Sequence, residues 1–467
     1  MTRHRAVVAR PAVLVWLVWT VTLASILVAI ARDGRNIPFE EDWLMVAPMT
    51  GHEPDLPRWL WSQNSEHRLP LPRLVNLALL RVTGDFRSTM VFDTLALAAL
   101  AAAMILVARS LRGGRTSPAD AFFPLLLLQL GNWDNLVWGW QIQFVLPTVL
   151  ACALLLIIVA RPGAPTRLGA AAGAAALVGL PLSGANGLVF TPTLAAWLAY
   201  TAWTRGRDPA LDHRPGGWLT AGAAFVAALL CVVYFIGYQA SPWNQPSPGL
   251  GATLVTAGKF LALSIGPAAA KRWLLSGIIV ALVFVTGLGL LLAAWRDPGR
   301  KDERLRILGL LAFFAAAAVL TLAIGWGRAG RAEATGRMPT RYVLLAAPGL
   351  CAAYFSALLY GRSWPGRLMP AAMAALLLLL FPFNTHAGLQ RRAWFGAGFA
   401  AFERDLEAGT PAPRLAHGHY EFMLHWDEPL MVTSLRQLHD AGIGPFGTWE
   451  PDPAPRAATA EGTTRVP

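Results

Sequence analysis

The chain has 467 residues, of which 55% are hydrophobic and 14% are charged, and its formal net charge is +12. A soluble domain carries about 25% charged residues, so the composition excludes an ordinary soluble protein. The basic residues gather in short connections between apolar segments, so we expect a membrane protein and no nucleic-acid partner.

Apolar segments long enough to cross a bilayer recur along the chain and predict an all-α, polytopic membrane protein with about 11 transmembrane helices. The expected spans are 11–31, 88–108, 121–130, a fourth ending near 160, 168–182, 188–203, 218–238, 277–295, 307–326, 342–360 and 368–381. A Gly-, Ser- and Asn-containing break at 183–187 separates the fifth span from the sixth.

Clusters of basic residues occupy alternate connections, which is the positive-inside pattern. They comprise Arg3, Arg5, Arg10, Arg109, Arg112, Arg115, Arg205, Arg207, Arg214, Arg296, Arg300, Lys301, Arg304, Arg306, Arg362 and Arg367. The pattern predicts a cytoplasmic N-terminus in the cell membrane and an extracytoplasmic C-terminal tail. We expect a transmembrane domain over 1–381, a small extracytoplasmic cap over 382–450 that contains helices near 394–406 and 431–441, and a disordered end over 451–467.

The first outer loop, from Pro38 to about Arg87, is the part of the chain where titratable residues are densest. Short amphipathic helices are expected within it at 56–61 and 72–80, lying at the membrane interface. The loop opens with Glu40, Glu41 and Asp42. Adjacent carboxylates repel each other, and in a partly dehydrated site this raises the pKa of at least one of them. A carboxylate with a raised pKa suits proton abstraction from a hydroxyl. The alternative is a solvated acidic start to the loop.

A second set of residues has the chemistry of a carbohydrate site. Tryptophan faces stack on sugar rings, and amide groups bind hydroxyls, although tryptophans also form interfacial belts. The Glu66-His67-Arg68 triplet could position a sugar or bind a phosphate, or its arginine could lie among lipid headgroups. The candidate substrate-binding residues are Glu66, His67, Arg68, Trp133, Asp134, Trp140, Gln141, Gln143 and Asn186.

The connection at 327–342 holds four arginines, Arg328, Arg331, Arg337 and Arg341, and one acid. Arginine binds phosphate through two parallel hydrogen bonds and keeps its charge, so Arg331, Arg337 and Arg341 are the candidate phosphate-binding residues. A headgroup anchor is the alternative, in which case a phosphate site could lie at Lys259, Lys271 or Arg272.

Three histidines in the tail, His417, His419 and His425, do not form a recognised metal-ligand motif. No metal ligands are therefore assigned. The sequence identifies no cofactor and leaves the participation of a divalent metal open.

Together these features resemble the GT-C superfamily of membrane glycosyltransferases, in particular the dolichyl-phosphate-mannose-mannosyltransferase type. In that family a first helix leads into a long outer loop with an acidic motif, which would fall on Glu40-Glu41-Asp42. A His/Lys-Pro-Pro-Leu type element follows in many members, and residues 66–72 are similar but interrupted by Arg68 and Leu69. The resemblance is architectural over 1–381 and rests on motifs only in the first loop.

The resemblance implies inverting transfer of a sugar from a polyprenyl-phosphate carrier to a glycan, lipid or protein acceptor outside the cell membrane. Asp42 or Glu41 would be the base, and Arg337 or Arg341 would contact the carrier phosphate. Two alternatives remain from the residues themselves: a lipid or glycan transporter or flippase, and a non-catalytic cell-envelope assembly protein. A transporter is expected to carry charged or broken helices near the middle of the membrane.

Overall fold

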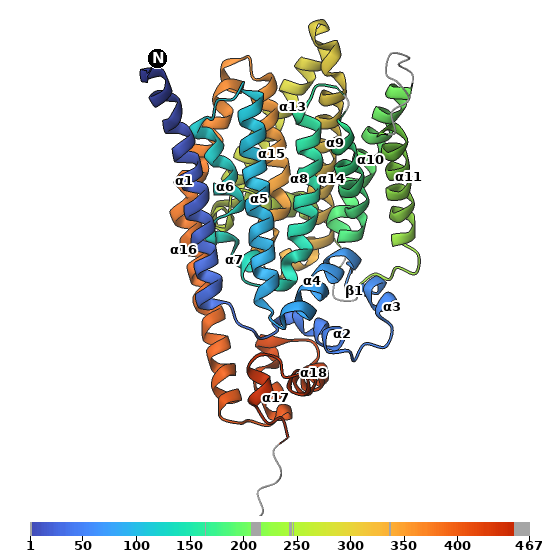
Figure 1. The fold of residues 1–467 in the computed structure, drawn as a ribbon, viewed down its shortest axis with the longest axis vertical. Coiled ribbons are helices and arrows are strands. Elements are labelled where there is room, and N and C mark those ends of the chain that lie inside the picture. Colours follow the sequence, from blue (N-terminus) through green and yellow to red (C-terminus); the bar gives the residue numbers. More distant parts are fainter. Residues whose placement is uncertain are drawn as a thin grey trace, which may run out of the picture.

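The computed structural model describes residues 2–163, 165–206, 216–241, 245, 247–335 and 338–452. Within these ranges the chain is almost entirely helical, with one two-stranded antiparallel ribbon formed by β1 (Gln63–Asn64) and β2 (His67–Arg68). Eight helices are long and apolar enough to cross a membrane. The fold is therefore that of an all-α, multi-pass membrane protein (Figure 1), and the expected number of 11 spans stays a prediction.

The bundle is built from long helices that run roughly parallel to its long axis (Figure 1). They are α1 (Thr2–Asp33), α5 (Arg87–Leu111), α8 (Ile142–Ala160), α10 (Ala185–Gly206), α11 (Gly216–Tyr234), α13 (Trp273–Arg296), α14 (Arg304–Thr335), α15 (Val343–Tyr360) and α16 (Trp364–Glu407), with the shorter α9 (Arg167–Gly179) and α12 (Leu250–Leu263). Helix α15 is apolar on all sides and nearly all of its side chains are buried, so it forms the centre of the bundle. Helices α1 and α11 expose large apolar side chains, as lipid-facing helices do.

The expected third span at 121–130 is a series of short, buried pieces. The turn η2 (Pro118–Ala121) leads into α6 (Phe122–Leu127), and then come η3 (Leu130–Asn132), α7 (Trp133–Leu136) and η4 (Gly139–Gln141). Trp133 and Asp134 lie in α7, and both side chains are buried. Gly131 permits this path: a Cβ there would lie 3.0 Å from the Cβ of Asn384 on α16.

One end of the bundle carries the first loop and the C-terminal helices together (Figure 1). The loop contains α2 (Val46–Thr50), α3 (Leu56–Trp61) and α4 (Pro70–Thr83), so both expected surface helices are present. Asp55 caps α3 by accepting a hydrogen bond from the Arg58 backbone N–H at 3.0 Å. At the other end of the chain lie α17 (Ala412–Met423), which the sequence did not predict, and α18 (Glu428–Asp440).

Two helices continue further than expected. Helix α16 runs unbroken past residue 381 to Glu407, so the helix expected at 394–406 is its last part. Helix α14 reaches Thr335, so Arg328 and Arg331 lie on a helix rather than in a loop. Arg207, Arg214, Arg337 and the segment 453–467 lie outside the described residues.

Candidate active site

The acidic triplet forms the first turn of η1 (Glu40–Met45), directly after α1 and a short extended connection. Glu40 has a φ of 50°, a left-handed conformation that a residue with a side chain adopts only when its surroundings hold it there. One contact that holds Glu40 is a hydrogen bond of 2.8 Å between its side-chain Oε2 and His425 Nδ1. This hydrogen bond with Glu40 is the main cause that raises the pKa of His425 above its usual value.

Phe39 anchors the triplet on its N-terminal side. Its ring centroid lies 4.8 to 6.4 Å from those of five aromatic rings, contributed by Trp138, Trp394, Phe395, Phe399 and Phe422. Edge-to-face and tilted packing at such distances is favourable, and here it joins the first loop to α16 and α17. The packing of Phe39 and the contact of Glu40 with His425 therefore hold the start of the triplet in place.

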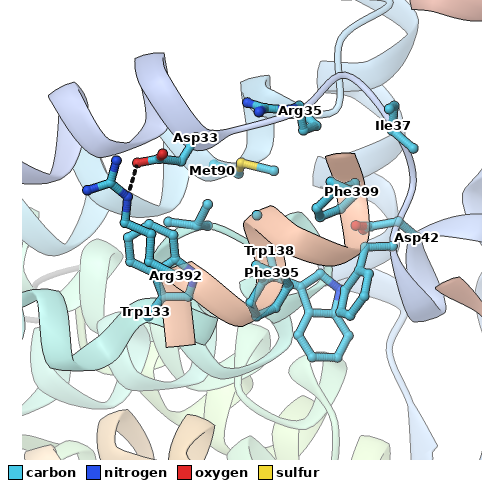
Figure 2. Close-up of a pocket in the computed structure, with 13 residues that line it drawn as sticks. Asp33, Arg35, Ile37, Asp42, Met90, Trp133, Trp138, Arg392, Phe395 and Phe399 are labelled. Atoms are coloured by element: carbon cyan, nitrogen blue, oxygen red, sulfur yellow. Dashed lines mark ion pairs between the residues drawn. The ribbon is translucent and has the colours of Figure 1, made fainter. Parts of the chain in front are cut away.

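Asp42 is 2% exposed and lies in the wall of a pocket between the end of α1, η1, α5, α7 and α16 (Figure 2). The pocket is largely apolar and aromatic, lined by Phe39, Met90, Trp133, Trp138, Phe395 and Phe399. Two ion pairs border it: Arg392 Nε lies 2.9 Å from Asp33 Oδ2 (Figure 2), and Arg35 Nε lies 2.9 Å from Glu403 Oε1. The arrangement places one carboxyl group among aromatic faces, with cations at its border.

Burial raises the pKa of Asp42 well above its usual range, and the neighbouring charge of Glu41 adds to this effect. Backbone hydrogen bonding at Phe39 and Trp140 acts in the opposite direction. The pKa of Glu41 is also raised, mainly by burial, although Arg341 opposes the shift. Both carboxylates therefore bind a proton more tightly than they would in water, which is the property of a general base.

Arg341 lies next to this site, just before α15. Its guanidinium carbon is 5.6 Å from the ring centroid of Trp138, which also lines the Asp42 pocket. Among the described residues Arg341 forms no ion pair, unlike Arg328. An arginine held over an aromatic face and beside a carboxylate retains hydrogen-bond donors for an anionic ligand. Arg331 is exposed and Arg337 lies outside the described residues.

The Glu66-His67-Arg68 triplet is bound to the protein itself. Glu66 Oε2 pairs with Arg328 Nη2 on α14 at 3.2 Å. Burial lowers the pKa of His67 to about 4, so this histidine is neutral at physiological pH. Arg68 donates hydrogen bonds to the carbonyl oxygens of Tyr234, Trp61 and Ile236 at 3.0, 2.9 and 2.8 Å. All three guanidinium nitrogens of Arg68 thus hold neighbouring backbone, and a substrate-binding role for the triplet stays a prediction.

The remaining candidate substrate residues are spread over several places. Trp133 lines the Asp42 pocket, whereas Trp140 and Gln143 line a smaller one. Asp134 pairs with Arg391 Nε at 2.8 Å and accepts a hydrogen bond from Thr340 at 2.8 Å, which indicates a structural role. Gln141 is buried, and within the described ranges neither its amide nitrogen nor its amide oxygen has a hydrogen-bond partner. Asn186 lies in the first turn of α10 and does not line the Asp42 pocket.

The sequence reasoning missed Asp93 on α5. Asp93 is 0% exposed, and neither of its carboxyl oxygens has a hydrogen-bond partner in the part of the chain that the structure describes. A single acid in an otherwise apolar span was the available signal, because intramembrane ionisable residues mark functional sites. Arg35, Arg392 and His425 were likewise not assigned to the site.

Across the described ranges, no group of three or more His, Cys, Asp or Glu side chains is arranged to hold a metal ion. No protein-family model and no curated protein matches the chain. The fold and the site together define a multi-pass, all-α membrane protein with a buried acid in an aromatic pocket, at the end of the bundle that carries the C-terminal helices.

Proposed function

We propose that this protein is a membrane glycosyltransferase of the GT-C type. It moves a sugar from a polyprenyl-phosphate carrier to a glycan, lipid or protein acceptor outside the cytoplasmic membrane, with inversion at the anomeric carbon. The observation that carries the proposal is the buried Asp42 carboxyl group, with its raised pKa, in the wall of an aromatic pocket.

Asp42 acts as the general base of the transfer. The acceptor hydroxyl oxygen forms a bond to the anomeric carbon while its proton moves to the Asp42 carboxylate. The bond between the anomeric carbon and the phosphate oxygen breaks, and its electron pair leaves with the polyprenyl phosphate. A base with a raised pKa takes the proton more readily, and burial strengthens its electrostatic effect on the reacting centre.

Aromatic side chains and arginines supply the binding groups. Trp133, Trp138 and the adjoining phenylalanines line the Asp42 pocket and have the chemistry to contact a sugar and the first isoprenoid units of a carrier. Both tryptophan rings are buried, so a substrate enters only when the pocket widens. Arg341 contacts the carrier phosphate, whose charge grows as it leaves, so the interaction is strongest in the transition state. Its location beside Glu41 and over Trp138 supports this role.

The test is direct. Purified protein in lipid is incubated with a panel of polyprenyl-phosphate sugars, and the release of polyprenyl phosphate is measured with and without added acceptors. We expect release by the parent protein and about a hundredfold less by Asp42→Asn, the usual scale for loss of a general base. Equal release by both proteins would remove Asp42 from the reaction, and no release from any donor would count against the transferase.

A flippase for a lipid or glycan is the second candidate. Two features of transporters favour it: the broken segment α6–η3–α7–η4 inside the bundle and the unpartnered Asp93 within a span. Reconstituted vesicles carrying a fluorescent polyprenyl-phosphate lipid distinguish the two functions. Translocation without sugar release supports the flippase, whereas release without translocation supports the transferase.

A further inference from the structure

Asp93 lies in the second turn of α5 (Arg87–Leu111), close to the end of the bundle that holds the acidic triplet. No part of its side chain reaches solvent, and neither carboxyl oxygen has a hydrogen-bond partner among the described residues. An ionised carboxylate in such surroundings costs several kcal/mol unless a cation or donors compensate it. No described residue therefore forms a hydrogen bond that would stabilise the ionised form of Asp93.

The environment of Gly139 connects Asp93 to Asp42. A Cβ atom at Gly139 would lie 3.6 Å from Asp42 Oδ1 and 3.3 Å from Thr89 Cβ, so Asp42 and Thr89 flank the same small gap. Thr89 and Asp93 are four residues apart on α5 and so share one helix face. Asp93 therefore lies one helical turn along α5 from Thr89, which neighbours Asp42.

We propose that Asp42 and Asp93 form a coupled carboxyl pair that holds one proton at neutral pH, with Asp93 as its protonated member and Asp42 as its ionised member. The inference deepens the proposed function, and it rests on that function for the role of Asp42 as the base. Asp93 contacts no substrate in this scheme and is a positioning residue.

The charged groups near Asp42 and Asp93 explain why the pair keeps one proton at neutral pH. Asp33, Arg35 and Arg392 line the Asp42 pocket, but Arg392 is paired with Asp33 and Arg35 with Glu403. The nearest acid in the chain, Glu41, adds a further negative charge beside Asp42. Other polar side chains around α5 that lack a hydrogen-bond partner for a buried atom, Thr94, Asn76 and Gln141, are uncharged. Two carboxylates in a buried site whose neighbouring arginines are already paired with other acids cannot both ionise easily.

Asp42 is the member that ionises first. It faces the pocket, and backbone hydrogen bonding at Phe39 and Trp140 supports its charge. Asp93 does not line the pocket and accepts no hydrogen bond from any described residue. During transfer the acceptor proton moves to Asp42, so the pair passes from one negative charge to none while Asp93 keeps its own proton. A second negative charge beside the departing phosphate is thereby avoided.

Infrared difference spectroscopy of the protein in lipid nanodiscs tests the pair without any need for turnover. We compare the parent, Asp93→Asn and Asp42→Asn over a range of pH, with the exposed Asp440→Asn as the control. We expect a protonated-carboxyl band at neutral pH that Asp93→Asn removes and Asp440→Asn leaves unchanged. In Asp42→Asn the band should disappear at a pH at least about one unit lower, since the neighbouring charge is gone.

Two results would overturn the pair: a band that survives in Asp93→Asn, or a band whose pH dependence is the same in Asp42→Asn and the parent. Asp93→Glu keeps the carboxyl group and should retain a protonated-carboxyl band. This variant is the control for the possibility that Asp93→Asn loses the band because it misfolds. In the transfer assay Asp93→Asn should lose at most about tenfold in turnover, less than Asp42→Asn, because the amide is neutral like the protonated acid. Should the infrared result hold with no transfer activity, the pair stands and the proposed function fails.

Discussion

His425 and Glu40 form a hydrogen bond of 2.8 Å between Nδ1 and Oε2, although 385 residues separate them in the chain. His425 lies between α17 and α18, and Glu40 begins the acidic triplet, so the bond fastens the C-terminal helices to the candidate active site. The hydrogen bond with Glu40 and the charges of Glu40 and Glu41 favour the charged form of His425, whereas partial burial and Arg331 oppose it. A contact of this kind depends on pH.

We expect the contact to protect residues 38–46 from amide hydrogen exchange at low pH but not at high pH. The pKa of folded His425 is raised, so its stabilising effect is complete below the unfolded value of about 6.5 and is lost as pH rises through the folded value. The parent should therefore exchange more slowly than His425→Gln at about pH 6, and the difference should disappear as pH rises above the folded pKa of His425. His417→Gln serves as the control, because His417 pairs with Glu428 inside the C-terminal helices. Identical exchange of the parent and His425→Gln at about pH 6 would contradict the prediction.

Substitution of the acids should separate their roles. We expect Asp42→Asn to lower turnover by about two orders of magnitude, and Glu41→Gln to lower it as well, because both carboxylates have raised pKa values at the site. Glu40→Gln should leave turnover within about threefold of the parent, since Glu40 is engaged by His425. The measurement is product formation at saturating donor, with thermal unfolding as a check on folding. Unchanged turnover in Asp42→Asn, Glu41→Gln and the double variant would exclude a carboxylate base here.

Arg341→Lys should reduce turnover at saturating donor although the positive charge is kept. Lysine cannot form the two parallel hydrogen bonds that an arginine makes with a phosphate, and the lost interaction is one that strengthens in the transition state. Arg367→Lys is the matched control, because Arg367 is exposed near the start of α16, at the opposite end of that helix from the site. If Arg341→Lys and Arg367→Lys are equally active, the phosphate site lies elsewhere, with Lys259, Lys271 and Arg272 the next to substitute.

The ion pair between Glu66 and Arg328 should contribute to stability. Its nitrogen-to-oxygen distance is 3.2 Å and both side chains are largely buried, at 15% and 19% exposure. We expect Glu66→Arg and Arg328→Glu each to lower the unfolding temperature, and the double swap to recover part of the loss, with a coupling energy of about 1–3 kcal/mol. Losses that simply add in the double variant would show that the pair is not coupled.

Reporter fusions can test the orientation in the membrane. The first loop and the C-terminal helices lie at the same end of the bundle, so reporters at Gly51 and Gly409 should give the same, extracytoplasmic signal. A reporter at Gly113, at the opposite end of α5, should give the cytoplasmic signal. Signals from opposite sides at Gly51 and Gly409 would contradict the topology.

Local signals predicted several elements well. Helix α3 has the bounds expected from the sequence, because Asp55 supplies an N-cap and Pro57 occupies its first turn. Helix α14 was expected to end near residue 326, since the following residues are polar. Their alanines, arginines and glutamate favour helix, so α14 continues to Thr335.

Contacts between distant segments could not be predicted in the same way. An apolar run such as 121–130 looks like a continuous span, and only packing against α16 shows that it is broken there. The meeting of Phe39 with Phe422, or of Glu66 with Arg328, depends on how helices far apart in the chain come together. Consequently the sequence identified the acidic triplet but not the partners that set its chemistry.

Helix α16 joins the membrane part of the protein to the pocket as a single rod of 44 residues, about 66 Å long at 1.5 Å per residue. Its first half is apolar enough to cross the bilayer, and its second half carries Phe395 and Phe399 into the pocket wall. Thinner or thicker lipid changes the tilt of a spanning helix. Because Phe395 and Phe399 lie on the same continuous helix as the spanning part, we expect a change in the tilt of that part to move the pocket wall.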